Sequence, residues 1–267
     1  MKEIVKEIKF ALESIKQNIK SSAELRASFL TSLFGMMINN SAFLVIWMSF
    51  GNLAGNMGGW QTIDYLLSYG MVALSFGVCY GFFAGIRYLP EIVRFGDLDK
   101  FLLSPKNVLL RISVSKFEAS AIGDLAFGMI CVSAWVFITG NSSIFTLLNI
   151  LFFTLSASLI FFFYGVAANS LAFYFADSRI IIQGVWEMLL TPAIFYGGAF
   201  QGIIKNVFIF IVPAMLLGNL PLEIIKHPTL NMYLLTVGIT FFWIVFSIYI
   251  FYKSIRKYES SNFINFG

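Results

Sequence analysis

Charged residues are scarce in this sequence. They make up 12% of the chain, against roughly 25% in an ordinary soluble protein. Hydrophobic residues make up 58%, and phenylalanine alone occurs 31 times. A chain of 267 residues cannot hide that much apolar surface inside a water-soluble fold, so another medium must solvate it. The composition therefore predicts an integral membrane protein.

Residues and motifs that carry catalysis or bind metals are also missing. There is one histidine, His227, which we expect to be a solvated loop residue. The two cysteines, Cys79 and Cys131, lie inside apolar runs, where we expect free thiols. The sequence has no phosphate-binding G-x-x-x-x-G-K-[ST] loop, no H-E-x-x-H pair and no G-x-S-x-G nucleophile turn. We therefore expect no catalytic site, no metal site and no cofactor in this chain, and we do not expect it to be an enzyme by itself.

What the sequence does contain is a series of long apolar runs. About twenty helical residues cross the hydrocarbon core of a bilayer at ~1.5 Å per residue. The runs predict an all-α, polytopic membrane protein with about six transmembrane helices. They cover residues 27–50, 63–86, 108–138 and 144–175, a stretch from about 180 that contains Pro192, and 232–252. In the second run glycines share one helix face, where we expect another helix to approach closely; they are Gly70, Gly77, Gly81 and Gly85.

Two segments outside these runs have patterns of their own. In residues 1–26 apolar side chains recur every three or four positions and most lysines lie off that stripe. This predicts an amphipathic helix in the membrane interface, with a soluble helix packed on another protein as the alternative. The apolar stretch 207–217 is too short to span a bilayer, so we expect residues 201–231 to form a re-entrant hairpin before the last span. The chain then divides into an interfacial helix (1–26), a transmembrane domain (27–252) and a tail (253–267).

Lysine and arginine are distributed unevenly among the connecting segments. Six lie in residues 1–26, six in 87–116, one at Arg179 and three after residue 252, which makes sixteen on one side. The segments on the other side contain only Lys205 and Lys226. The positive-inside rule places the sixteen in the cytoplasm, so we expect both termini there and residues 201–231 outside. The net charge of +4 therefore reports topology, and we expect no nucleic-acid partner.

A few polar residues fall inside the predicted spans. Asn39 and Asn40 lie in the middle of the first, and we expect them to face other helices because amides exposed to lipid are costly. Asp124 and Glu187 are the deep acidic residues, and carboxylates within a membrane are candidate functional groups. For Asp124 the alternative is an interfacial carboxylate paired with a basic residue earlier in its run, Lys116 or Arg111.

The polar loop at residues 87–107 carries the most specific pattern. It reads G-D-L-D-K-F-L-L-S-P over residues 96–105. This run resembles the loop between the second and third spans of the permease subunits of bacterial type-2 ABC exporters. The layout is also similar, with an amphipathic helix at the start, six spans, cytoplasmic ends and a hairpin before the last span.

The resemblance implies both a function and partners. In that family the loop forms a short coupling helix that sits in a cleft of a separate P-loop ATPase subunit. Two ATPase subunits bind ATP and Mg²⁺, and a second permease, identical or a sister, completes the complex in the cytoplasmic membrane. By position the ATPase contacts would come from Asp97, Leu98, Asp99, Phe101, Leu102 and Leu103. The implied function is export by alternating access.

The sequence leaves two points open. A non-transporting membrane subunit, such as an assembly factor or a sensor, is the alternative function. Neither the cargo nor the choice between a homodimer and a heterodimer of permeases follows from the residues.

Overall fold

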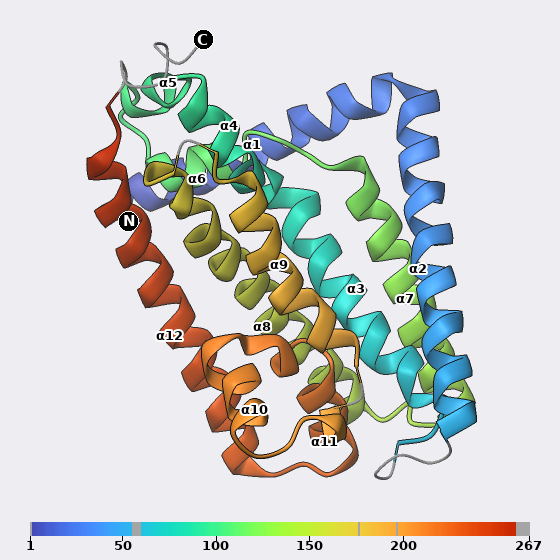
Figure 1. Ribbon diagram of the computed structural model, residues 1–267. Helices are drawn as coiled ribbons and strands as arrows, with labels where there is room; N and C mark the ends of the chain where they lie inside the picture. Colours follow the sequence, from blue (N-terminus) through green and yellow to red (C-terminus); the bar gives the residue numbers. More distant parts are fainter. Residues whose placement is uncertain (1, 55–59, 176, 196, 260–267) are drawn as a thin grey trace.

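The computed structural model describes residues 2–54, 60–175, 177–195 and 197–259, and the regular elements in these ranges are all helices (Figure 1). The predicted all-helical membrane fold is confirmed. The α-helices are α1 (Lys2–Glu24), α2 (Arg26–Ala54), α3 (Asp64–Phe83), α4 (Leu89–Arg94), α5 (Leu98–Leu102), α6 (Val108–Ser113), α7 (Ala119–Thr139), α8 (Ile144–Asn169), α9 (Arg179–Ile194), α10 (Gly202–Asn206), α11 (Asn219–Lys226) and α12 (Leu230–Ser254). Short 3-10 helices and one π-helical segment, η4, extend or join the described α-helices. They are η1 (Ala84–Tyr88), η2 (Ser170–Phe173), η3 (Gly197–Ala199), η4 (Val207–Ile211), η5 (Pro213–Leu216) and η6 (Ile255–Lys257).

Five helical stretches in the described ranges are long and apolar enough to cross a membrane. They are Arg26–Leu53, Asp64–Arg94, Ala119–Thr139, Ile144–Phe173 and Leu230–Lys257. Helix α9 has 16 residues, about 24 Å at 1.5 Å per residue, so it is shorter than a full span. Figure 1 nevertheless shows α9 running alongside the bundle from the end that holds α4 to the end that holds α10. The six predicted spans are therefore five full-length helices and one short one.

The stretch 108–138, expected as one span, is two helices. Helix α6 ends at Ser113 and α7 begins at Ala119 after an extended residue, Glu118 (φ −111°, ψ 112°). The charges between the two helices have partners at this end of the bundle. Glu118 pairs with Arg87 at 3.3 Å, and the Lys116 ammonium lies 5.6 Å from the ring centroid of Tyr88. A continuous helix would carry these charges into the bilayer, so the chain breaks where they end.

Helix α3 is the centre of the bundle and packs most extensively against α7. The two backbones approach closely at glycines, because a Cβ on Gly128 would lie 2.7 Å from the carbonyl oxygen of Gly70. A Cβ on Gly77 would lie 2.8 Å from the carbonyl oxygen of Ala121. The glycine face predicted in the second run is therefore a helix-packing face at these positions.

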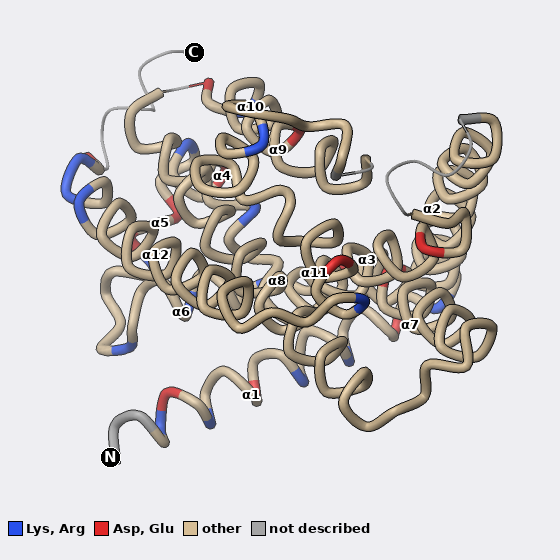
Figure 2. Tube along the Cα trace, turned by 90° about the horizontal axis from the view of Figure 1, so that it is seen from below, with Lys and Arg blue, Asp and Glu red and all other residues tan. Residues whose placement is uncertain are grey.

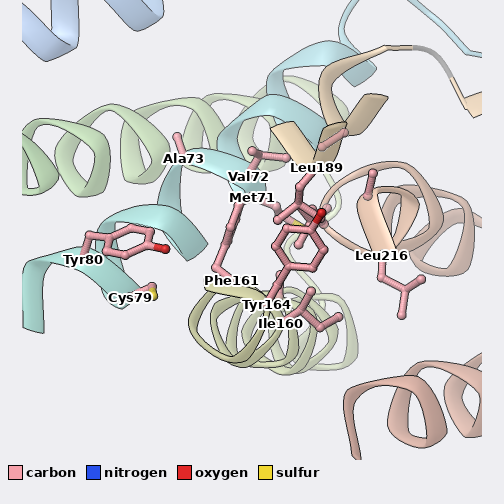
Figure 3. Packing of buried hydrophobic residues seen from close by; sticks show 14 of the residues in the cluster. Met71, Val72, Ala73, Cys79, Tyr80, Ile160, Phe161, Tyr164, Leu189 and Leu216 are labelled. Carbon is pink, nitrogen blue, oxygen red and sulfur yellow. The ribbon is translucent and has the colours of Figure 1, made fainter. Parts of the chain in front are cut away.

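The largest buried apolar cluster joins α3 to α8, α9 and the turn η5. Figure 3 shows Met71 of α3, Phe161 and Tyr164 of α8 and Leu189 of α9 gathered there, with Leu216 of η5 beside them. These side chains come from segments up to 145 residues apart in the chain. The segment after α9 is therefore built into the same core as the long helices.

That segment, residues 201–231, enters and leaves at one end of the bundle, opposite α4, α5 and α6 (Figure 1). Its helix α11 is tied to α3 by an ion pair between the Lys226 ammonium and the Asp64 carboxylate, 2.7 Å apart. The same carboxylate accepts hydrogen bonds from the backbone N–H of Gln61 (2.8 Å) and from the indole N–H of Trp135 (3.3 Å). Burial raises the pKa of Glu223 on α11, although the charge of Lys205 opposes the shift. The hairpin expected here is present, although it consists of short helical pieces.

Helix α1 lies along one side of the bundle (Figure 2). The same view shows that charges are confined to short stretches of an otherwise uncharged chain. Helix α1 is held at α6, where the Asn18 side-chain amide donates a hydrogen bond to the carbonyl oxygen of Val114 at 2.8 Å. Glu7 of α1 pairs with Lys106 at 3.9 Å, just before α6. A cavity of about 860 Å³ separates the apolar face of α1 from this region.

Candidate functional site

The polar loop 87–107 folds into two short helices with a sharp corner between them. Pro90 lies in the first turn of α4, where its missing N–H costs nothing. Gly96 follows α4 with φ 73°, in the left-handed region that favours glycine. The next helix, α5, begins at Leu98. The G-D-L-D motif is therefore the corner and first turn of a separate helix.

Helix α5 is held against the body of the protein from two sides. The Leu98 side chain is fully buried in the main apolar cluster. The Arg111 guanidinium of α6 donates to the carbonyl oxygens of Lys100 (2.9 Å) and Phe101 (3.0 Å). Its centre also lies 5.3 Å from the ring centroid of Phe101. Arg111 thus fixes the C-terminal end of α5, because a guanidinium can serve two carbonyl groups at once.

Three apolar side chains on or beside α5 are exposed, together with Lys100. Leu103 is 87% exposed, and Leu102 and Phe95 are also exposed. Asp97, which directly precedes α5, pairs with Lys100 of that helix. Among the contact residues that the resemblance implies, Leu98 is inside the protein and Phe101 is half-buried, so the accessible apolar edge consists of Phe95, Leu102 and Leu103. Phe95 was not identified from the sequence.

Ion pairs join this loop to the long helices. Glu91 of α4 contacts Arg179, the first residue of α9, at 3.1 Å. Arg87 contacts Glu118 before α7 at 3.3 Å. A displacement of α4 and α5 would therefore act on the ends of both α9 and α7.

A cavity of about 450 Å³ lies between α2, α3, α7 and α9. The polar residues predicted inside the spans all line it: Asn39 and Asn40 from α2, Asp124 from α7 and Glu187 from α9. The structure thus brings together four side chains that are separated by up to 148 positions in the sequence. This volume falls within the range of ~300–1,000 Å³ that is usual for small-molecule sites.

Asp124 is the most buried of these groups, with 5% of its surface exposed. Its Oδ1 accepts a hydrogen bond from the Asn40 amide at 2.6 Å, and Asn40 Oδ1 accepts one from the Tyr69 hydroxyl at 3.2 Å. Pairing of Asp124 with Lys116 or Arg111, the alternative from the sequence, is wrong. The break before α7 leaves both cations outside the bundle, where they contact Tyr88 and α5.

The other two predicted residues lie at the open side of the cavity. Asn39 and Glu187 are exposed, and the Glu187 carboxylate accepts a hydrogen bond from Thr191, one turn later on α9, at 3.4 Å. Asn40 faces neighbouring helices as expected, whereas Asn39 does not. A second cavity, of about 440 Å³, shares Phe76, Glu187 and Leu190 with the first. It continues to Arg87 and Arg179 beside α4.

An aromatic contact closes the cavity toward α10. Trp47 of α2 meets Phe195, which follows α9, with ring centroids 4.4 Å apart. Phe195 in turn meets Phe200, and Phe200 meets Phe208 of η4. Sequence reasoning missed Trp47 and Tyr69, because an aromatic residue in an apolar run carries no sign of what it faces.

Comparison with known proteins identifies the family. No group of acidic, histidine or cysteine side chains that could hold a metal was found among the described residues. No curated protein and no solved structure matched the chain. A family model described as ABC-2 family transporter protein matches residues 36–262, which include four of the five long spans in full, most of the first span, the loop with α5 and the segment before α12. The resemblance seen in the loop motif is therefore confirmed, and this multi-pass membrane protein belongs to the ABC-2 family of transporter proteins.

Proposed function

We propose that this chain is the permease subunit of an ATP-driven exporter in the bacterial cytoplasmic membrane. The observation that carries the proposal is α5, a short helix with an exposed apolar edge, in a loop that ion pairs join to the start of α9 and to Glu118 before α7. Exposed Leu and Phe side chains flanked by carboxylates are suited to dock into a partner's cleft. The partner would be a dimer of P-loop ATPase subunits that binds ATP and Mg²⁺, since this chain lacks the phosphate-binding motif.

The charge distribution supports the orientation that this function needs. Helices α4, α5 and α6 lie at the end where α12 finishes (Figure 1). Sixteen of the 18 basic residues belong to segments of this side, and Lys205 and Lys226 belong to the other. The positive-inside rule then places α5 and both termini in the cytoplasm and residues 201–231 outside.

A mechanism follows from the contacts of the loop. Closure of the two ATPases on ATP would push α5, and the Glu91–Arg179 pair would transmit the movement to α9. Because α9 forms one wall of the cavity between α2 and α7, its displacement would change access to that cavity. The cargo path would be completed by a second permease, identical or a sister chain. Alternating access is in this way coupled to hydrolysis in the partner.

The test is purification of the tagged chain from its native membranes in mild detergent, followed by mass spectrometry. Leu103→Asp places a charge on the exposed edge of α5, and we expect it to abolish recovery of a P-loop ATPase. Ile203→Asp is the matched control, because Ile203 is 82% exposed at the opposite end of the bundle. The double change Asp97→Lys with Asp99→Lys should also abolish both association and export.

The proposal fails under two outcomes. One is recovery of the wild-type chain without any ATPase under conditions that keep a known ABC complex intact, which would favour a non-transporting membrane subunit. The other is recovery of equal amounts of ATPase by the Leu103 variant and the Ile203 variant, which would show that the exposed edge of α5 does not dock the ATPase.

A further inference from the structure

The cavity between α2, α3, α7 and α9 has a one-sided electrostatic character. Two carboxylates line it, Asp124 and Glu187, and no lysine, arginine or histidine does. The basic residues of the adjoining cavity are engaged elsewhere, since Arg87 pairs with Glu118 and Arg179 with Glu91. The cavity therefore presents negative charge without a compensating cation of its own.

Its hydrogen bonds are also incomplete. The donors of the polar network point toward Asp124, from Tyr69 to Asn40 and from Asn40 to Asp124 Oδ1. Asp124 Oδ2 is buried and has no hydrogen-bond partner in the described part of the chain. A buried carboxylate oxygen without a partner is costly. A cation bound in the cavity that Asp124 lines would offset the charge of this carboxylate.

Aromatic side chains form a large part of the remaining wall. Phe43, Trp47, Tyr69, Phe76 and Phe195 all line the cavity. The faces of such rings attract cations, and the attraction is stronger where water is excluded.

We propose that this cavity binds hydrophobic organic cations, with Asp124 as the principal counter-charge and Glu187 at the entrance. The identification of such a cation as cargo rests on the proposed permease function, whereas binding itself does not. Glu187 lies where the two cavities meet, so a cation arriving from the α4 end passes its carboxylate before reaching Asp124.

The probes are tetraphenylphosphonium and tetraphenylborate, which have the same size and shape and opposite charge. The full chain, purified with whatever subunits accompany it, is placed in nanodiscs of zwitterionic lipid without ATP. Equilibrium dialysis, with empty nanodiscs subtracted, gives the affinity for each probe. We expect the phosphonium to bind at least tenfold more tightly than the borate.

Variants locate the charge responsible for that preference. Asp124→Asn should abolish the preference, and Glu187→Gln should reduce it by a factor of about three. Asp177→Asn removes a carboxylate outside the cavity and should leave it unchanged. Thermal unfolding of each variant establishes that it is folded. If Asp124→Asn does not fold, Glu187→Gln decides, because its exposed side chain is not needed for packing.

Equal binding of the two probes, or a preference that survives both cavity variants, overturns the inference. The outcome is separable from that of the ATPase test, because binding is measured without nucleotide and with α5 unchanged. Loss of the cation preference alongside an intact ATPase complex would refute only the ligand class. A preserved preference in a chain that recruits no ATPase would leave a cation-binding membrane protein.

Discussion

Replacing Lys226 by methionine should destabilise the protein strongly for a single change at the end of a helix. The Asp64 carboxylate is only 3% exposed in its side chain, and Lys226 provides its opposite charge at 2.7 Å. Removing one partner of a buried ion pair costs about 3–5 kcal/mol, since the other charge stays buried. The Lys226 side chain is 28% exposed. Solvent therefore screens the pair, and the lower figure of about 3 kcal/mol applies.

The assay is thermal unfolding in detergent or nanodiscs. At roughly 2–4 °C per kcal/mol for a chain of this size, Lys226→Met should lower Tm by roughly 6–12 °C. Asp64→Asn should cost less, because Lys226 can turn to water while the amide still accepts the bond from Gln61. The double variant, Asp64→Asn with Lys226→Met, should recover most of the loss. Lys205→Met, which changes the other lysine at this end, is the control.

Two results would refute this reasoning. One is a Tm of Lys226→Met equal to that of Lys205→Met, which would mean that the pair contributes nothing. The other is a double variant no more stable than Lys226→Met, which would mean that the loss comes from packing of the lysine chain and not from an orphaned carboxylate.

Three further predictions concern separate parts of the fold. Gly85→Ala should prevent folding, because the new Cβ would lie 1.8 Å from the carbonyl oxygen of Ile112. Gly184→Ala is the control and should express normally, because a Cβ there would have nothing within 4 Å. Size-exclusion chromatography compares the two variants. The pKa of Glu223 is raised in the folded state, so the stability of the protein falls as the pH rises from the ordinary pKa of 4.5 to the raised pKa. Glu223→Gln should therefore have a higher Tm than wild type at pH 7 and the same Tm at pH 4. Arg111→Lys should weaken recovery of the ATPase severalfold without changing Tm by more than about 2 °C, because lysine lacks the planar guanidinium that lies over the Phe101 ring.

Much of the fold could be predicted because lipid imposes simple rules on sequence. Apolar runs of twenty or more residues gave the long helices, and the short run 207–217 correctly excluded a span. The break at residues 114–118 could not be predicted from hydropathy. It depends on Gly85 allowing α6 to pack beside η1, and on Arg87 meeting Glu118, and both are contacts between distant segments.

The residues of the candidate site could be predicted from the sequence, but their hydrogen-bond and ion-pair partners could not. Polar residues in apolar runs are conspicuous, so Asn40, Asp124 and Glu187 were found. That Asn40 bonds to Asp124 depends on how α2 packs against α7, and nothing local to either residue encodes it. For the same reason the ion pair between Asp64 and Lys226, which are 162 positions apart, left no trace in the sequence.

The sequence located the loop motif, but it could not show which of the motif's side chains are buried and which are exposed. A five-residue helix is too short to show periodicity, so Leu98 and Leu103 look equivalent in the sequence. The structure places Leu98 in the core and Leu103 on the surface. Packing of Leu98 into the apolar cluster and the two hydrogen bonds from Arg111 hold α5 in this orientation.

The attachment of α1 to α6 links the helix that we expect in the membrane interface to α5. Helix α1 is joined to the start of α6 through Glu7 and Lys106 and to its end through Asn18, while α6 holds α5 through Arg111. If α1 floats at the headgroup level, thinning of the membrane draws it inward and α5 moves with it. Turnover should then depend on acyl-chain length, with a maximum at the thickness for which α1 and α5 are both unstrained.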